Sequence, residues 1–200
     1  MTDWNKYKNT FPTRYLEQGY FDEYIKKIIS ETKPKTILDI GGGVTGTTAL
    51  VDSGAKVYLL DPFVTNKPDW IFEKINWDTV QQFDLVVARG SINYLTTNEL
   101  LKINKLISPE GTFIANTFLN QPKQEWSERL YVNTLGEEGT ERSRYNLEKQ
   151  VIEHELVTKS GEVISHTFFY HSPDIYKKIF PGINITEYKT NSAILHFRFF

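Results

Sequence analysis

The stretch that decides the fold reads TILDIGGGVTG at residues 36–46, and KVYLLDP follows it at residues 56–62. Each stretch contains a short apolar run. The first run ends in a cluster of glycines and the second in a carboxylate. Short apolar runs bounded by glycine or proline are typical of strands buried in a parallel sheet. The two stretches therefore predict a strand, a glycine turn, a short helix and a second strand, which is half of a nucleotide-binding unit.

The glycine turn leaves room for a ligand at the tip of the first strand. Gly41 and Gly43 lie where the chain must turn and pass close to a ligand, and glycine has neither a Cβ nor a restricted φ angle. Gly46 falls where the next helix is expected to pack tightly on the strand. Asp61 comes 20 residues after Gly41, and its carboxylate can accept hydrogen bonds from both hydroxyls of a ribose.

Asp39 distinguishes between two classes of cofactor. The spacing of Gly41, Gly43 and Gly46 also fits the dinucleotide fingerprint G-x-G-x-x-G. A carboxylate two residues before the first glycine would repel a pyrophosphate and attract a cationic ligand. An NAD-dependent oxidoreductase remains an alternative.

The acid, the glycine turn and the second acid together resemble motif I of the class I S-adenosylmethionine-dependent methyltransferases. The resemblance covers residues 35–118 and the C-terminal hairpin, and the family's third glycine comes one residue sooner than Gly46. It implies an α/β fold, a three-layer Rossmann-like sandwich whose mostly parallel seven-stranded sheet has an antiparallel C-terminal strand. It also implies S-adenosylmethionine as the cofactor, which in that family carries a sulfonium and an ammonium near the turn and no phosphate.

The resemblance also assigns roles to single residues. Asp39 and the glycine turn would hold the amino-acid end of the cofactor, Asp61 the ribose, and Asn76 with Trp77 the adenine. The predicted cofactor-binding residues are Asp39, Gly41, Gly42, Gly43, Asp61, Pro62, Asn76, Trp77 and Arg89.

A central strand is predicted at residues 83–88, and residues 89–95 resemble the family's loop beside the transferable methyl group. Many relatives carry histidine where this chain has Asn93, so a base of that kind is absent here. The segment before the first strand often lies over the cofactor in this family. The predicted substrate residues are Tyr15, Tyr20, Asn93 and Tyr94. The sequence lacks the (Asp/Asn)-Pro-Pro-Tyr signature of nucleobase methylases, which argues against a DNA substrate.

The other elements follow from periodicity and from turn residues. Apolar positions at helical spacing predict a helix over residues 14–32. A third strand is expected around residues 70–75, and a helix capped by Thr97 or Asn98 runs to Ile107 before a strand at 112–118. Ser172 and Pro173 begin a short helix, and a terminal hairpin pairs residues 184–188 with 193–199.

Residues 119–171 break this alternation of strands and helices. A polar stretch at 136–142 is typical of a loop, whereas residues 151–157 and 162–169 show the period-2 pattern of a hairpin. We expect a single methyltransferase domain over residues 1–200, with an N-terminal helical segment at 1–32. Residues 119–171 would form an inserted cap over the carboxyl ends of the strands, as a lid and substrate wall.

Histidine is the natural base near neutral pH, and the chain has four. His171 lies between the hairpin and the helix that follows it, and it is the predicted catalytic residue. His196 is expected to be structural. His154 and His166 could oppose each other across the hairpin, but their spacing matches no standard metal motif, so no metal site is predicted.

Composition limits the class of protein. A net charge of −2 without a long basic block argues against nucleic acid as a partner. The absence of cysteine excludes disulfides and thiolate sites, and no segment reaches the ~18 apolar residues of a membrane span. We expect a cytoplasmic protein that has no membrane partner, and the sequence leaves its oligomeric state open.

The function that fits best is methyl transfer from S-adenosylmethionine to a small-molecule acceptor by in-line displacement. A near-neutral chain and a cap rich in aromatic residues favour a small acceptor. Two alternatives stay open: a methyltransferase-like binding module without turnover, which the lack of histidine at position 93 favours, and an NAD-dependent oxidoreductase.

Overall fold

The computed structural model describes residues 19–132, 138–189 and 192–199. Among them the chain divides into two compact units. The larger consists of residues 20–119 and 171–199, and the smaller of residues 120–170. No helix in this described part is long and apolar enough to cross a membrane.

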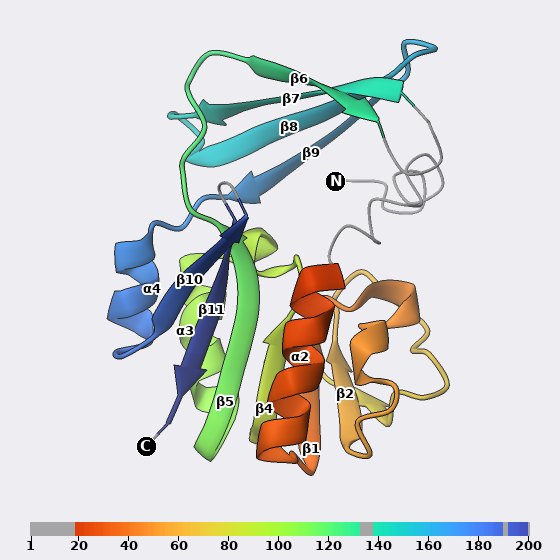
Figure 1. Ribbon diagram of the computed structural model, residues 1–200, viewed down its shortest axis with the longest axis vertical. Coiled ribbons are helices and arrows are strands. Elements are labelled where there is room, and N and C mark those ends of the chain that lie inside the picture. Colours follow the sequence, from red (N-terminus) through yellow and green to blue (C-terminus); the bar gives the residue numbers. More distant parts are fainter. Residues whose placement is uncertain (1–18, 133–137, 190–191, 200) are drawn as a thin grey trace. The chain divides into compact units, whose positions relative to one another are not determined.

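The larger unit is built on a seven-stranded sheet in the order β10-β11-β5-β4-β1-β2-β3 (Figure 1). Strands β1 to β5 run parallel, and β11 pairs antiparallel with β5 and with β10. This is the mostly parallel sheet predicted from the sequence, with its antiparallel C-terminal strand. The strands are β1 (Thr36–Ile40), β2 (Lys56–Leu60), β3 (Glu73–Lys74), β4 (Phe83–Ala88), β5 (Ile107–Phe118), β10 (Asn184–Lys189) and β11 (Ser192–Arg198).

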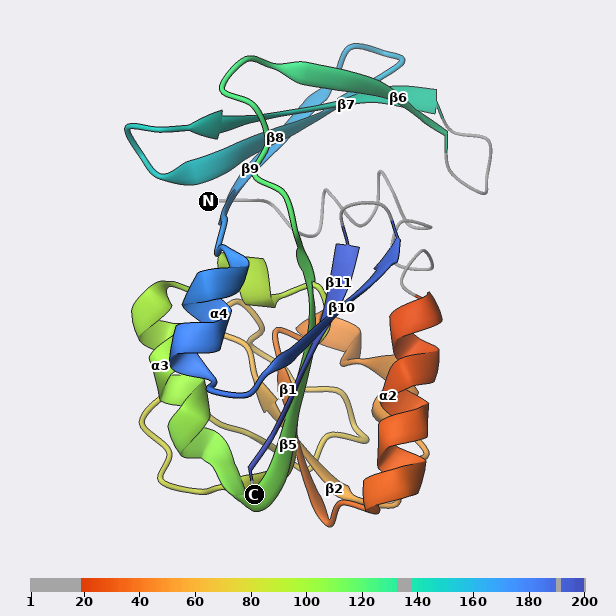
Figure 2. The same ribbon diagram turned by 60° about the vertical axis from the view of Figure 1, so that its left-hand side comes forward.

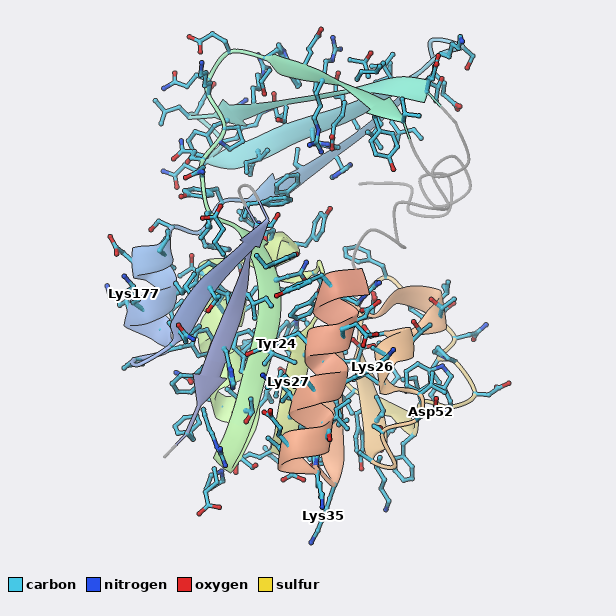
Figure 3. The ribbon with its side chains drawn as sticks, viewed as in Figure 1. Tyr24, Lys26, Lys27, Lys35, Asp52 and Lys177 are labelled. Atoms are coloured by element: carbon cyan, nitrogen blue, oxygen red, sulfur yellow. The ribbon has the colours of Figure 1, made fainter. Side chains whose placement is uncertain are left out.

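Helices cover both faces of this sheet, which makes it the middle of three layers (Figure 2). Helix α2 (Gly19–Thr32) packs on one face and turns Lys26 and Lys27 to solvent (Figure 3). Helices α3 (Thr97–Leu106) and α4 (Pro173–Ile179) pack on the other face. Because side chains alternate along a strand, neighbouring residues of β1 enter different cores. Both faces of the central strands are therefore apolar, as the sequence predicts.

Several local expectations for this unit are wrong. Helix α3 is capped by Thr96, not by Thr97 or Asn98, because Thr96 and Glu99 form a reciprocal capping box. β1 and β2 are joined by two short 3₁₀ helices, Gly43–Thr45 and Thr48–Leu50, instead of one helix. A Cβ on Gly46 would lie 2.5 Å from the Trp70 ring, so Gly46 makes room for that indole and not for a helix.

Other differences concern where elements begin and end. The third strand is only two residues long, at Glu73–Lys74, although residues 70–75 were expected to form it. Strand β5 begins at Ile107, five residues before the predicted start at 112. Of the predicted helix over 14–32, residues 19–32 are confirmed, and residues 14–18 lie outside the described part. The terminal hairpin and the helix start at Ser172 are confirmed.

The smaller unit is a four-stranded antiparallel sheet in the order β6-β7-β8-β9. The predicted hairpin is confirmed, with His154 directly opposite His166. Residues 138–142 of the polar stretch that was expected to be a loop belong instead to strand β7, where Arg142 pairs with Glu155 on the neighbouring strand. The strands are β6 (Ser127–Val132), β7 (Glu138–Asn146), β8 (Val151–Thr158) and β9 (Val163–Phe169). Its role as a lid over the larger sheet stays a prediction.

Candidate functional site

The carboxyl ends of the parallel strands bring most of the predicted residues to one edge of the larger sheet. Gly41 follows β1, Asp61 follows β2, and Arg89 follows β4. The chain leaves the β1–β4 pair in opposite directions, towards β2 on one side and β5 on the other. In open α/β sheets, ligands bind at the carboxyl ends of the strands next to such a reversal of strand order.

Asp39 is fully buried beneath the glycine turn. Its Oδ2 accepts a hydrogen bond from the Thr47 backbone N–H at 2.7 Å, and its Oδ1 accepts one from the Thr47 hydroxyl at 2.8 Å. Burial raises the pKa of Asp39 to about 6, although the Thr47 hydrogen bonds and the Arg89 charge oppose that rise. Asp39 therefore shapes the loop after the turn, and its contact with a cofactor stays a prediction.

Each of the first three glycines of the turn meets a different constraint. A Cβ on Gly42 would lie 2.0 Å from Asp39 Oδ2, and one on Gly41 would lie 2.4 Å from Ser91 Cβ. Gly43 has a φ angle of +71°, and no described atom outside its immediate neighbours lies within 4 Å of a Cβ placed there. Gly41 and Gly42 are thus needed for packing, whereas Gly43 borders open space.

Asp61 connects the end of β2 to this turn. Its Oδ2 accepts a hydrogen bond from the Gly43 N–H at 3.0 Å, and its Oδ1 accepts one from the Phe63 N–H at 2.9 Å. A carboxylate oxygen has two lone pairs, so each oxygen can accept one further hydrogen bond. The adjacent Pro62 is exposed. The geometry suits a carboxylate that also accepts hydrogen bonds from a diol.

The residues predicted to contact adenine lie after β3. Asn76 is exposed, and its Oδ1 accepts a hydrogen bond from the Asp78 N–H at 2.8 Å. Trp77 is half-buried and packs against the core on the α3 side of the sheet. The amide is used to form a local turn, and its contact with a base stays a prediction.

Arg89 forms a two-point ion pair with Asp22 of α2. Arg89 Nη2 lies 2.9 Å from Asp22 Oδ2, and Arg89 Nε also donates to Asp22 Oδ1. The pair links the end of β4 to the helix that covers β1. Near the start of the same helix, Tyr20 is 58% exposed and stacks on Tyr188 at a ring separation of 5.0 Å. Tyr15 lies outside the described residues.

The loop after β4 is held against the glycine turn. Ser91 packs where a Gly41 side chain would be, and its hydroxyl donates to the Ile40 carbonyl. Asn93 is only 4% exposed, and Tyr94 is half-buried. Asn93 Oδ1 accepts a hydrogen bond from the Thr117 hydroxyl at 3.0 Å.

His171 fixes the far end of this loop. Its Nε2 lies 2.8 Å from the Leu95 carbonyl oxygen, and its ring packs edge-on against Tyr176. A carbonyl only accepts, so Nε2 carries the proton and Nδ1 holds the lone pair in the neutral ring. Burial lowers the pKa of His171 and favours that neutral form. A catalytic role for His171 stays a prediction.

Sequence reasoning missed the partners of these residues. Thr47, Ser91, Thr117 and Asp22 each complete a contact on which the site depends. Thr47 is eight residues from Asp39 and follows the glycine turn, which is a usable signal. The other partners come from distant segments, and a single sequence gives no signal for them.

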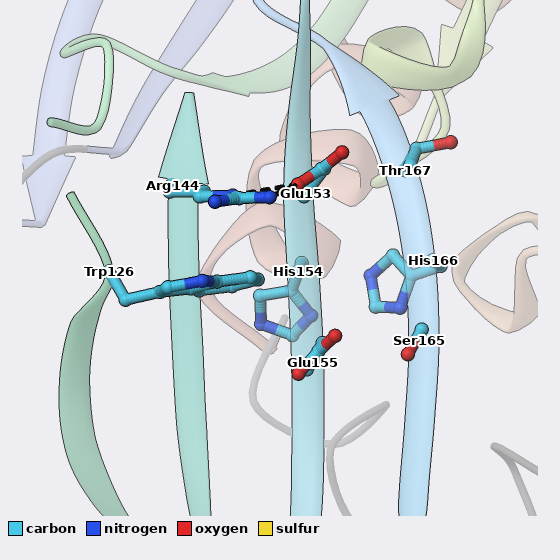
Figure 4. A pocket seen from close by; sticks show the side chains of 8 residues that line it. All are labelled: Trp126, Arg144, Glu153, His154, Glu155, Ser165, His166 and Thr167. Atoms are coloured by element: carbon cyan, nitrogen blue, oxygen red, sulfur yellow. Dashed lines mark hydrogen bonds and ion pairs between the residues drawn. The ribbon is translucent and has the colours of Figure 1, made fainter. Parts of the chain in front are cut away.

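The smaller unit has a cavity of its own, of about 390 Å³ (Figure 4). On one side, Trp126 lies against the Arg144 guanidinium at 4.7 Å from the ring centre, and Arg144 Nη2 pairs with Glu153 at 2.7 Å. His154 Nε2 lies 2.6 Å from Glu141 Oε1. Among the described residues, no group of three or more acidic or histidine side chains is arranged to hold a metal ion. The cavity is lined by Trp126, Arg144, Glu153, His154, Glu155, Ser165, His166 and Thr167.

Comparison with solved structures identifies the fold. The chain superimposes on a Clostridium acetobutylicum S-adenosylmethionine-dependent methyltransferase with a TM-score of 0.67 and 12% identity, covering 98% of each chain. It superimposes on the CcbJ methyltransferase of Streptomyces caelestis with a TM-score of 0.63 and 13% identity, covering 88% of this chain and 94% of that one. The chain has the class I methyltransferase fold.

A third neighbour with this methyltransferase fold was solved with both a small molecule and a cofactor product. It is the 1,6-didemethyltoxoflavin-N1-methyltransferase of Burkholderia thailandensis, with bound 1,6-didemethyltoxoflavin and S-adenosylhomocysteine. The TM-score is 0.50 at 13% identity, covering 97% of this chain and 89% of that one. The sequence matches no protein-family model. It also matches no curated protein sequence.

Proposed function

We propose that this protein transfers a methyl group from S-adenosylmethionine to a small-molecule acceptor by in-line displacement. The observation that carries the proposal is the hydrogen bond between Asp61 and the Gly43 N–H. It brings together, at the edge where such folds bind ligands, an acid suited to a ribose and a glycine bordering open space. The methyltransferase fold and the small-molecule complex of one neighbour support the same assignment.

In this proposal the cofactor lies across the carboxyl ends of β1 and β2. Asp61 would accept hydrogen bonds from the ribose hydroxyls, with Pro62 beside it, and Asn76 and Trp77 would contact the adenine. The glycine turn Gly41–Gly43 would accommodate the amino-acid end. Asp39 and Arg89 would support the cofactor site indirectly. Asp39 binds Thr47 and Arg89 binds Asp22, and these contacts shape the surrounding loops.

Methyl transfer from a sulfonium depends mainly on alignment of donor and acceptor, which can supply roughly 7–11 kcal/mol in favourable cases. The acceptor would lie against Asn93 and Tyr94 in the loop after β4, with Tyr20 and Tyr15 as further contacts. Where the acceptor must lose a proton, we assign its uptake to Nδ1 of His171, which holds the lone pair in the neutral ring.

Replacing His171 tests this role. His171→Gln keeps a side-chain N–H for the Leu95 carbonyl but has no titratable atom. We expect cofactor affinity to be retained and turnover to fall about 100-fold, the lower end of a general-base contribution. Unchanged turnover across the pH range would show that His171 only holds the loop.

The cofactor assignment is tested by calorimetric titration of the protein with S-adenosylmethionine, S-adenosylhomocysteine and NAD in parallel. We expect the first two to bind at micromolar concentration and NAD not to bind. Asp61→Ala should weaken S-adenosylhomocysteine binding at least about 30-fold, because two hydrogen bonds to a charged group are lost. Asp52→Ala, which removes an exposed carboxylate on the far side of the 3₁₀ turns, should leave binding unchanged (Figure 3).

Each contrary result indicates a different function. Binding of NAD alone would indicate an oxidoreductase. Tight binding of S-adenosylhomocysteine without methyl transfer to a broad acceptor panel would indicate a binding module. Full affinity in Asp61→Ala would show that the ribose lies elsewhere.

A further inference from the structure

Asn93 carries a buried hydrogen-bond donor that the fold leaves unused. The side chain is 4% exposed, and its Nδ2 has no hydrogen-bond partner among the described residues. A buried polar group without a hydrogen-bond partner destabilises the fold. Such a group can persist at a ligand-binding site, because the bound ligand supplies the missing hydrogen-bond partner.

The side-chain oxygen of Asn93 faces a chain of two hydroxyls. The Thr117 hydroxyl donates its single hydrogen to Asn93 Oδ1 at 3.0 Å. The Tyr176 hydroxyl lies 3.0 Å from the same Thr117 oxygen, so Tyr176 must be the donor there. The chain of donors runs from Tyr176 through Thr117 to Asn93. Asn93 Nδ2, which can only donate, is the amide atom that this chain of hydrogen bonds does not use.

The chain neighbours of Asn93 belong to the loop that borders the proposed site. Asn93 lies in the loop after β4, between Ser91, which packs on the glycine turn, and Leu95, which His171 holds. Thr117 lies near the carboxyl end of β5. All of these residues belong to the larger unit.

We propose that Asn93 is a positioning residue whose Nδ2 donates a hydrogen bond to an oxygen of the methyl acceptor. The acceptor therefore belongs to the class of molecules with a carbonyl or carboxylate oxygen near the atom that is methylated. This inference rests on the proposed function. In the transfer, the acceptor's lone pair forms the bond to the methyl carbon, and the electron pair of the broken C–S bond returns to sulfur. Asn93 takes part in neither bond and removes no proton.

Side-chain amide signals in ¹⁵N NMR spectra of the full chain test the proposal. The Asn93 signals are assigned by their loss in Asn93→Asp. With the protein saturated with S-adenosylhomocysteine, millimolar benzamide and benzoate should move these signals in a saturable way. Benzylamine has the same ring but no oxygen and should not. Asn104 is an internal control, since its Nδ2 already donates to the Ile179 carbonyl at 2.6 Å.

Two variants separate positioning from simple packing. Thr117→Val and Tyr176→Phe each remove one of the two hydroxyls in the chain that ends at the Asn93 oxygen, while preserving side-chain shape. We expect Thr117→Val to weaken benzamide binding about tenfold and Tyr176→Phe less, the size expected for about one lost hydrogen bond. S-adenosylhomocysteine affinity should stay within about twofold. A purely structural role would lower the melting temperature of both variants without changing the preference for oxygen-bearing probes.

Three outcomes overturn the inference, and they are distinguishable. Movement of the Asn93 signals by S-adenosylhomocysteine alone would make Asn93 a cofactor contact. Signals unmoved by benzamide and benzoate, in protein that binds S-adenosylhomocysteine, would refute the inference and leave the proposed function standing. Failure to bind S-adenosylhomocysteine would overturn the proposed function, and the inference with it.

Discussion

The two sheets of this protein are specified by different physical interactions. In the seven-stranded sheet, residues 37–40 of β1 and 85–88 of β4 are wholly buried, and helices cover both faces. In the four-stranded sheet, one face carries ion pairs between strands, such as Arg142 with Glu155 and Arg144 with Glu153. One sheet is buried by apolar packing on both faces, whereas the other combines a small apolar cluster with ion pairs between its strands.

This difference determines how each sheet should respond to change. Burying a large apolar side chain contributes about 1.5–3 kcal/mol, whereas an exposed ion pair contributes about 0–1 kcal/mol. The apolar sheet also holds the glycine turn, where a Cβ on Gly41 or Gly42 would have no room. Substitutions in the larger unit should therefore cost more, and matched substitutions in the two units can test this.

Alanine at Gly42 should have the largest effect. Its Cβ would lie 2.0 Å from Asp39 Oδ2, so the carboxylate must leave Thr47. Overpacking and two lost hydrogen bonds together should lower the free energy of unfolding by about 4 kcal/mol. Gly161 in the β8–β9 turn has a φ angle of +84°, and a Cβ placed there has no atom within 4 Å. Gly161→Ala is therefore strained only in its backbone and should lower the free energy of unfolding by about 1 kcal/mol. Urea unfolding measures the cost of each substitution. Equal costs would show that the two units tolerate added volume equally well.

The same difference explains which elements could be predicted from sequence. The strands at 36–40 and 83–88 could be predicted because burial on both faces makes the run nearly continuously apolar. The β8–β9 hairpin could be predicted because apolar residues alternate along its strands. β7 was missed because Arg142 and Arg144 pair with glutamates on β8. A cross-strand ion pair leaves no period that distinguishes a strand from a polar loop.

The site divides in a similar way. Asp61 and the glycines were predicted because they follow predicted strands directly, and Asp39 because it comes two residues before the first glycine. Their roles could not be found, since Asp39 proved to be fully buried and bonded to Thr47. The Tyr176–Thr117–Asn93 chain joins an α-helix, a strand and a loop separated by up to 83 residues (176 − 93), and only the folded chain brings them together.

The pH dependence of stability also differs between the two units. We expect Asp39 in the larger unit to show a larger change than Glu153 in the smaller one. Its pKa is raised from 3.8 to about 6 by burial. A carboxyl group with a raised pKa contributes stability that is present below pH 3.8 and is lost as the pH rises through 6. Asp39→Asn should therefore cost more at pH 4 than at pH 7, by up to about 3 kcal/mol. A cost independent of pH would show that the carboxyl titrates normally.

Glu153 in the smaller unit should respond in the opposite direction and more weakly. Hydrogen bonds from Arg144, Asn146 and Lys149 lower the pKa of Glu153 from 4.5 to about 2. A carboxylate with a lowered pKa contributes stability that is present above pH 4.5 and is lost as the pH falls through 2. Its partners Lys149 and Arg144 are 65% and 38% exposed, so water and salt screen the interaction. Glu153→Gln should cost under about 1 kcal/mol at pH 7, and less at pH 2.5 or in high salt. Urea unfolding at both pH values and at two salt concentrations measures this cost. If Glu153→Gln costs as much as Asp39→Asn, or if its cost does not change with salt, charge pairs stabilise this sheet as strongly as burial stabilises the other.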